Sequence, residues 1–383
     1  MEIQTPRRTR KDGYTYQTTT IDGGPLEGSL WFSLPTVHED LLSESSDGAL
    51  LALLIPAMYC GEDIQISSKI NAHLVTAINQ KLQTLLIEIM PFLTRIDIEI
   101  ADKNLNTTQI GTGVAKGVGT GFSGGIDSWL TILERQQSSE QPPLTHLLFN
   151  NVGSHGSRDY SLFIKRFDEL KSAAEELDLP FLSINSNMNS FYKPLFGKQL
   201  GFQQTHTIRN AAVAFSLGAG LGEWLYSSTY TYKDIACKSS KDMARTDPII
   251  LSILSRPELQ LHDSGTQLSR FQKTVYVADN PLVQNHLDIC VKGAIGENCS
   301  ECWKCLRTLT ALDITGKVNN FNQCFDLEKY RKVKRKYLRK IIFSIQPMES
   351  ELRIEAKKNG YPMPLIPSLF GSIVRFMKTY FRS

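Results

Sequence analysis

Strand-like and helix-like patterns alternate through the middle of the chain. Short apolar runs that suit buried strands recur between longer stretches whose apolar residues return every three or four positions. The strand-like runs cover residues 118–122, 145–151, 180–185, 223–228 and 258–263, and helical patterns begin near residues 126, 160, 206 and 270. This alternation predicts an α/β fold with a parallel sheet covered by helices on both faces. Ligands bind such sheets beyond the carboxyl ends of the strands.

The first 112 residues follow a different rhythm. Residues 1–13 are polar and basic, and we expect them to form a flexible tail. In residues 14–112, short strand-like runs precede a buried helical pattern at 47–60, which Pro56 interrupts. A second helical pattern covers 71–90, and a strand-like alternation follows it. We predict a small α+β domain at 14–112, in which no motif indicates chemistry.

The chain ends in a basic region. Residues 328–340 carry eight Lys or Arg and one Glu, with apolar residues at helical spacing. The pattern predicts a basic amphipathic helix within a C-terminal region at 319–383. This helix either packs on the body of the protein with a solvated face or binds nucleic acid or another anionic surface.

Composition limits the class of protein. The 383 residues suggest about two domains, and the net charge of +3 is too small to indicate nucleic-acid binding by itself. No apolar run is long enough to span a bilayer, and the N-terminal residues lack the apolar core of a secretory signal. We therefore expect a cytoplasmic protein without a membrane segment. The seven cysteines are an odd count and do not suit a disulfide framework.

Glycines gather between the first strand-like run and its helix, in the sequence GTGFSGGIDS at 119–128. The Lys-Ser/Thr pair of a P-loop is absent from this stretch. The glycines do spell G-x-G-x-x-G, but no acidic residue ends the second strand, as dinucleotide binding would require. A nicotinamide or flavin site is therefore disfavoured.

The SGGIDS loop, residues 123–128, has the chemistry of a polyphosphate site. Gly124 and Gly125 allow backbone N–H groups to approach an anion, and the helix that follows adds its positive end. Ser123 and Ser128 offer hydroxyl donors. Asp127 suits a place beside phosphate if Mg²⁺ lies between them. We expect these five residues to bind a nucleotide.

The same loop resembles the pyrophosphate loop of the PP-loop ATP pyrophosphatases, which carry an SGGxDS signature after the first strand. The resemblance implies binding of ATP with Mg²⁺ and cleavage between the α and β phosphates. Enzymes of this family attach AMP to a carboxylate, amide or carbonyl oxygen, and a nucleophile then displaces the AMP.

Four cysteines lie within sixteen residues. Cys290, Cys299, Cys302 and Cys305 have the spacing C-x8-C-x2-C-x2-C. Four thiolates at such spacings can surround a structural Zn²⁺, and an iron–sulfur cluster is the main alternative. A closed site with four cysteine ligands leaves no open position for a substrate.

The two motifs together are similar to those of the 7-cyano-7-deazaguanine synthases of the queuosine pathway, a PP-loop subfamily. The resemblance covers residues 113–318 and leaves out the N-terminal region and the basic tail. It implies a 7-deazaguanine carboxylate as acceptor and ammonia as nucleophile, giving an amide and then a nitrile. Relatives with added domains occur in anti-phage defence operons, where a partner protein's amine could be the nucleophile and operon partners could form a complex with the enzyme.

Further residues are candidates for the site. Arg209, in a segment that resembles the Arg-Asn-bearing helix of the family, either faces the nucleotide or forms a surface salt bridge. Lys273 and Arg270 follow the last strand-like run and could contact ATP phosphates. We interpret His206 as structural. Cys237 follows the fourth strand-like run, where an inert thiol and a reactive one are both possible.

These observations predict an enzyme that adenylates an acceptor, with Asp127, Lys273 and Arg209 as its catalytic residues. Two alternatives stay open. One is ATP-dependent thiolation of tRNA or a small molecule, with Cys237 carrying sulfur. The other is a zinc-stabilised protein without enzymatic activity that binds nucleic acid or acts as a scaffold through residues 328–340.

Overall fold

The computed structural model describes residues 1–101, 117–154, 160–195, 200–290 and 297–364. Its centre is a set of parallel strands in the spatial order β11-β10-β7-β8-β9. The strands are β7 Gly117–Gly121, β8 His146–Asn150, β9 Phe181–Ser186, β10 Leu221–Ser227 and β11 Gln260–Ser264. The predicted α/β alternation is thus confirmed. Residues 113–116, at the start of the segment 113–318 that carries the resemblance, lie outside the described residues.

The same sheet continues into the N-terminal strands. Its order runs on through β4, β3, β1, β5 and β6, and β4 pairs with β9 in the antiparallel sense, with Phe32 opposite Ser186. These strands are β1 Glu2–Ile3, β2 Arg7–Lys11, β3 Tyr14–Asp22, β4 Gly28–Pro35, β5 Ile64–Ile66 and β6 Ile98–Ile100. The sheet is therefore mixed, and it joins the segments predicted as two domains.

The expectation of a flexible tail at residues 1–13 is wrong. Ile3 is fully buried, and β2 pairs with β3 from Arg7 opposite Thr18 to Lys11 opposite Tyr14. All five residues of β2 have exposed side chains, so its sequence lacks the apolar alternation of a strand. The backbone ladder holds this edge strand, and a ladder does not depend on side-chain polarity.

Helix α1, Asp47–Cys60, lies in the core that the two segments share. It continues through Pro56 without a break, because residues on both sides of the proline are buried in tertiary contacts. It packs closely on α7, His206–Ser216: a Cβ on Gly48 would lie 2.7 Å from the carbonyl oxygen of Ala212. The predicted helix at 71–90 consists of three segments, α2 Ala72–Ala77, the π-helical η2 Ile78–Leu82 and α3 Gln83–Ile89.

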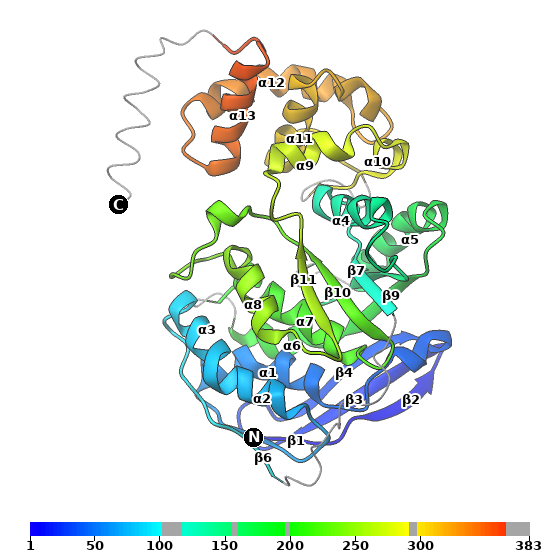
Figure 1. The fold of residues 1–383 in the computed structure, drawn as a ribbon, viewed down its shortest axis with the longest axis vertical. Helices are drawn as coiled ribbons and strands as arrows, with labels where there is room; N and C mark the ends of the chain where they lie inside the picture. Colours follow the sequence, from blue (N-terminus) through cyan, green and yellow to red (C-terminus); the bar gives the residue numbers. More distant parts are fainter. Residues whose placement is uncertain (102–116, 155–159, 196–199, 291–296, 365–383) are drawn as a thin grey trace.

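A second core lies between the sheet and a layer of C-terminal helices, which Figure 1 shows above the sheet. The remaining helices are α4 Ile126–Gln137, α5 Tyr160–Glu176, α6 Asn189–Tyr192, α8 Asp247–Leu254, α9 Arg270–Val277, α10 Pro281–His286, α11 Trp303–Ile314, α12 Leu327–Ile342 and α13 Pro347–Lys358. The predicted basic helix is α12, and its apolar face, which includes Tyr330 and Tyr337, is buried in this second core. Within the described ranges, no helix is both long and apolar enough to cross a membrane.

Candidate functional site

The SGGIDS loop links the end of β7 to the start of α4. Gly124 has a φ of +72°, and a Cβ there would meet the side chain of Leu170 at 2.7 Å, so the position favours glycine. Gly125 is the extended N-cap residue of α4. The Ser128 hydroxyl donates to the carbonyl of Gly125 at 2.9 Å and lies 3.4 Å from the Ser123 hydroxyl. The loop therefore lies at the N-terminus of a helix, as an anion site requires.

The loop opens into a cavity of about 910 Å³ between the carboxyl ends of the strands and the C-terminal helices. A cavity of this volume suits a nucleotide-sized ligand. Among the residues predicted for the site, the cavity is lined by Ser123, Gly125, Asp127, Ser128 and Arg270. The predicted site residues Gly124, Lys273 and Arg209 do not line it.

Asp127 joins two basic residues of α9. Its carboxylate accepts from Arg270 Nη2 at 2.5 Å and from Lys273 Nζ at 3.3 Å. Burial by itself would raise the pKa of Asp127, but Arg270 and Lys273 outweigh burial and hold the pKa below its usual range. Lys273 is fully buried and also donates to the carbonyl of Ser228, so it lies behind Asp127. The structure thus brings three predicted residues together, with Lys273 outside the cavity lining.

Arg209 has a different place from the one expected. It is fully buried in α7, where Nη1 donates to the carbonyl of Val152 at 2.7 Å and to Asn189 Oδ1 at 3.1 Å. Its guanidinium lies 3.5 Å from the centre of the Tyr192 ring. Burial lowers the pKa of Arg209 to about 10. These contacts tie α7 to the chain after β8 and to α6, and they do not face the cavity.

Four basic residues that the sequence reasoning missed line the cavity with Arg270: Arg166, Arg245, Lys304 and Arg307. We call Arg166, Arg270, Lys304 and Arg307 the cationic wall. Burial, together with the charges of Arg270 and Arg307, lowers the pKa of Lys304. Burial and then Arg270 lower the pKa of Arg307 to about 10. Cations placed so that they oppose one another's charge mark a site suited to an anion.

The four cysteines of the motif come together near this wall. Their sulfur atoms all lie within 4.8 Å of one another. The Sγ atoms of Cys290 and Cys302 are 3.9 Å apart, and those of Cys302 and Cys305 are 3.5 Å apart. A tetrahedron with Zn–S bonds of about 2.3 Å has sulfur separations of ~3.8 Å. The four cysteines could therefore hold one metal ion. Gly293 and Gly296, which fall between Cys290 and Cys299 in the sequence, lie outside the described residues.

The cysteine cluster is connected to the cavity in two ways. Cys302 is the N-cap of α11 and Cys305 lies in its first turn, so the cluster holds the turn that carries Lys304. On the other side, Cys290 lines the cavity, and its carbonyl accepts from Arg166 at 2.9 Å. The cluster therefore positions residues of the cationic wall. A signal was present in the sequence, because Lys304 and Arg307 lie inside and just after the cysteine motif.

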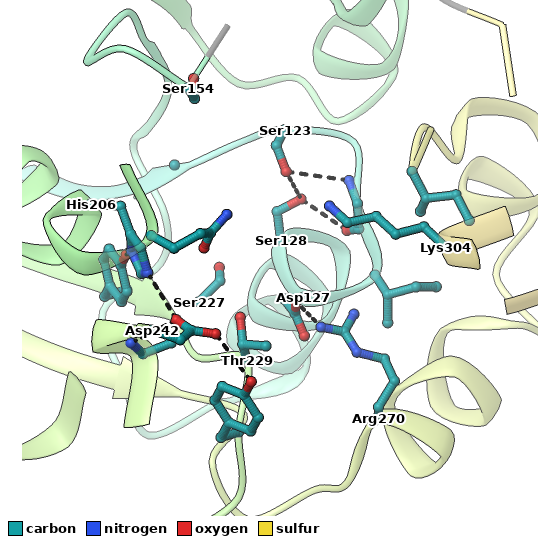
Figure 2. A pocket seen from close by; sticks show the side chains of 18 of the residues that line it. Ser123, Asp127, Ser128, Ser154, His206, Ser227, Thr229, Asp242, Arg270 and Lys304 are labelled. Carbon is teal, nitrogen blue, oxygen red and sulfur yellow. Dashed lines mark hydrogen bonds and ion pairs between the residues drawn. The ribbon is translucent and has the colours of Figure 1, made fainter. Parts of the chain in front are cut away.

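A histidine and an aspartate face the cationic wall across the cavity. Figure 2 shows His206 and Asp242 on the side opposite Lys304 and Arg270. His206 Nδ1 lies 2.7 Å from the hydroxyl of Tyr226, and Nε2 lies 3.6 Å from Asp242 Oδ1. All three residues line the cavity. The sequence showed no shared spacing among them, because they come from three separate segments.

Two further predicted features lie on the surface. Cys237 is exposed and does not line the cavity. Helix α12 exposes most of its basic side chains, namely Lys329, Arg331, Lys332, Arg335, Lys336, Arg339 and Lys340. Its buried Tyr337 lines part of the cavity. The helix therefore has one solvated basic face and one apolar face that packs on the body of the protein.

A scan against models of protein families and a search of curated proteins found no match for this chain. The likeness to PP-loop enzymes therefore rests on the two motifs, and it stays a prediction.

Proposed function

We propose that the protein is an ATP-dependent enzyme that adenylates a carboxylate or amide acceptor and releases pyrophosphate. One observation carries the proposal: the SGGIDS loop, at the N-terminus of α4, opens into a large cavity whose facing side chains are cationic. A helix N-terminus, converging hydroxyls and several basic residues together suit a polyphosphate better than a singly charged ligand.

In this proposal the chain binds ATP through its phosphates. Ser123, Ser128 and the backbone around Gly125 form one side of the phosphate site. Arg270, Lys304 and Arg307 form the other side, where they stabilise the charge that develops on the departing pyrophosphate. The protein holds both reactants in place and excludes water, as is usual in phosphate chemistry.

Asp127 fits a role beside Mg²⁺ only in part. Its side chain is 20% exposed and lines the cavity, but each of its oxygens already has a basic partner in α9. A carboxylate oxygen can accept a second contact, so Asp127 can hold the ion carried by ATP and still orient Arg270. The ion would offset negative charge on the phosphates, and the residues of the loop would orient them.

The cysteine cluster fits zinc. Sulfur separations of 3.5 to 4.0 Å suit thiolates around a single ion, whereas a cluster of several irons spaces its thiolates more widely. Burial and the neighbouring thiols raise the pKa of Cys305. A divalent cation is what would allow the four groups to ionise together. We assign this metal a structural role.

The acceptor and the nucleophile follow from the family resemblance. A 7-deazaguanine carboxylate and ammonia are the first candidates, and the amine of a partner protein is the second. Thiolation has no structural support, because Cys237 lies outside the cavity lining. The exposed basic face of α12 is available to an anionic partner such as nucleic acid, so this alternative stays a prediction.

The deciding experiment supplies ATP, Mg²⁺, ammonium and 7-carboxy-7-deazaguanine to the purified protein and follows AMP and the base-derived products by mass spectrometry. We expect AMP and an amide or nitrile. Asp127→Ala should lose at least about 10²-fold in rate, because the phosphate site loses its anchor for Arg270. Asp63→Ala, remote from the cavity, serves as the control. If the wild-type protein binds ATP but forms no AMP, this acceptor is wrong; if it binds no ATP, the proposal fails.

A further inference from the structure

The side of the cavity opposite the cationic wall carries a histidine held at both ring nitrogens. His206 is the first residue of α7, Tyr226 lies in β10, and Asp242 precedes the turn that leads to α8. The 2.7 Å contact from His206 Nδ1 to the Tyr226 hydroxyl and the 3.6 Å approach of Nε2 to Asp242 fix the plane of the ring. With its proton on Nε2 toward the carboxylate, the ring accepts from Tyr226 through Nδ1.

Asp242 is itself held in place. Its Oδ2 accepts from the Tyr230 hydroxyl at 3.0 Å, and its Oδ1 accepts from the backbone N–H of Ala244 at 3.1 Å. Burial by itself would raise the pKa of Asp242, but the contacts with His206 outweigh burial and lower it. The carboxylate therefore stays ionised at neutral pH beside the imidazole ring.

The charges around His206 differ from those at the phosphate loop. Asp247 of α8 lies behind the ring, and its carboxylate accepts from Thr207 at 2.6 Å. Arg245 also lines the cavity, and its guanidinium stacks over the Tyr230 ring, 4.5 Å from the ring centre. This side of the cavity therefore places the Asp242 carboxylate beside a proton acceptor, with the Asp247 carboxylate buried behind them. It suits an amine that arrives as a cation, whereas the cationic wall suits phosphates.

We propose that His206, oriented by Asp242, takes up through the Tyr226 hydroxyl the proton that a cationic amine loses before it attacks the adenylate. This inference rests on the proposed function. The cationic amine passes one proton to the Tyr226 oxygen while the Tyr226 proton passes to His206 Nδ1, and the neutral nitrogen then bonds to the acyl carbon. The second proton, which the nitrogen loses as the amide forms, is taken up by the departing AMP phosphate. The bond between the acyl carbon and the AMP oxygen breaks, and its electron pair leaves with AMP. The products are an amide, AMP and a protonated His206 paired with Asp242.

The test separates the two chemical steps with 7-carboxy-7-deazaguanine as the acceptor. ATP–pyrophosphate exchange measures adenylation. Ammonium and hydroxylamine then serve as alternative nucleophiles. Ammonium has to lose a proton before it attacks, whereas hydroxylamine is largely neutral at the assay pH and needs less help from a base. His206→Asn keeps an amide near the Tyr226 hydroxyl but cannot take up a proton. His262→Gln, which changes an exposed histidine of β11, is the matched control.

For His206→Asn we expect exchange within about 3-fold of wild type, amide formation with ammonium lower by about 10² or more, and hydroxamate formation lower by less than about 10-fold. Tyr226→Phe should show the same selective loss with ammonium. If the His206→Asn protein melts at a much lower temperature than wild type, Tyr226→Phe is the variant that tests the relay. Equal losses with both nucleophiles, or no loss with ammonium, would overturn the relay and leave the adenylation proposal standing. Absence of exchange in the wild-type protein would overturn both.

Discussion

Single side chains set the charge of the cavity. Asp127 offsets part of the charge on Arg270 and Lys273. Lys304, by contrast, has no hydrogen bond or ion pair within the described part of the chain, and its ammonium lies 5.7 Å from the centre of the Trp303 ring. Burial and the neighbouring guanidinium groups already lower the pKa of Lys304, so the bound anion gains more from this residue than from a solvated lysine. Lys304 is therefore the residue at which the phosphate site is most easily tested.

Lys304→Ala should weaken ATP binding by about 10- to 100-fold, because a charge-assisted contact to phosphate contributes about 1.5–3 kcal/mol. Isothermal titration of ATP in the presence of Mg²⁺ measures the change. Lys332→Ala removes an exposed lysine from α12 and should leave binding within about 2-fold. Equal affinities for the two variants would count against the cationic wall as a phosphate site.

Asp247 gives the fold a measurable pH dependence. Burial raises the pKa of this carboxyl to about 6. The folded state then holds the proton more tightly than the unfolded chain, whose aspartate titrates near pH ~4. The stability that this group contributes is complete below pH ~4 and is lost as the pH rises through about 6.

Asp247→Asn should therefore become more stable relative to wild type as the pH rises from 4 to 7, by up to about 3 kcal/mol. Urea unfolding of both proteins at several pH values measures this difference. Because Asn keeps an acceptor for Thr207, the comparison isolates the charge. A difference that stays constant with pH would show that Asp247 titrates normally.

At the scale of elements, α11 connects the cysteine cluster to the cavity. Its first turn begins inside the cysteine cluster and carries Lys304 and Arg307 on the side that lines the cavity. From the same cluster, the backbone N–H of Asp288, two residues before Cys290, donates to the carbonyl of Gly124 at 2.9 Å. Loss of the metal should therefore disturb the phosphate site as well as the local fold.

Cys305→Ser should remove the bound metal and lower the free energy of unfolding by about 3 kcal/mol or more, because metal binding contributes directly to folding. It should also weaken ATP binding. Elemental analysis, thermal unfolding and ATP titration measure the three effects. Cys60→Ser, a change at an exposed cysteine outside the cluster, should alter none of them. A variant that loses metal but binds ATP normally would separate the cluster from the cavity.

At the scale of the whole molecule, one sheet and two cores integrate segments that the sequence presents as separate. The core around α1 includes residues from β1 to β11, and the second core includes residues from β7 to α13. The N-terminal region thus supports the same sheet that carries the SGGIDS loop. We expect the described parts of the chain to unfold together.

Ile3→Ala should lower the free energy of unfolding by about 2–4 kcal/mol, the usual cost of truncating a fully buried aliphatic side chain. Thermal unfolding followed together by tryptophan fluorescence and by far-UV circular dichroism should show one transition that moves to lower temperature. Thr9→Ala, on the exposed β2, should leave it in place. A second transition that is insensitive to Ile3→Ala would indicate that the N-terminal region folds independently.

Local patterns predicted most of the central elements. The strands β7 to β11 and the helices α4, α5, α7 and α9 follow from apolar periodicity, because each element buries one face and so repeats apolar residues at its own period. The shorter helices α6 and α8 were not predicted. Periodicity did not predict β1 and β2, since two-residue and fully polar strands carry no pattern. The π-helical turn at Ile78–Leu82 likewise interrupts a helix whose apolar spacing gives no sign of it.

By itself, the sequence determined the α/β alternation, the position of the SGGIDS loop at a strand end and the cysteine set that converges. In each case the residues that produce the feature lie close together along the chain. Only the tertiary structure decided that Arg209 is a buried residue of the core, that Lys304 and Arg307 line the cavity, and that His206 meets Tyr226 and Asp242. The direction of a side chain depends on what packs against its element, and those partners come from segments far apart in the chain.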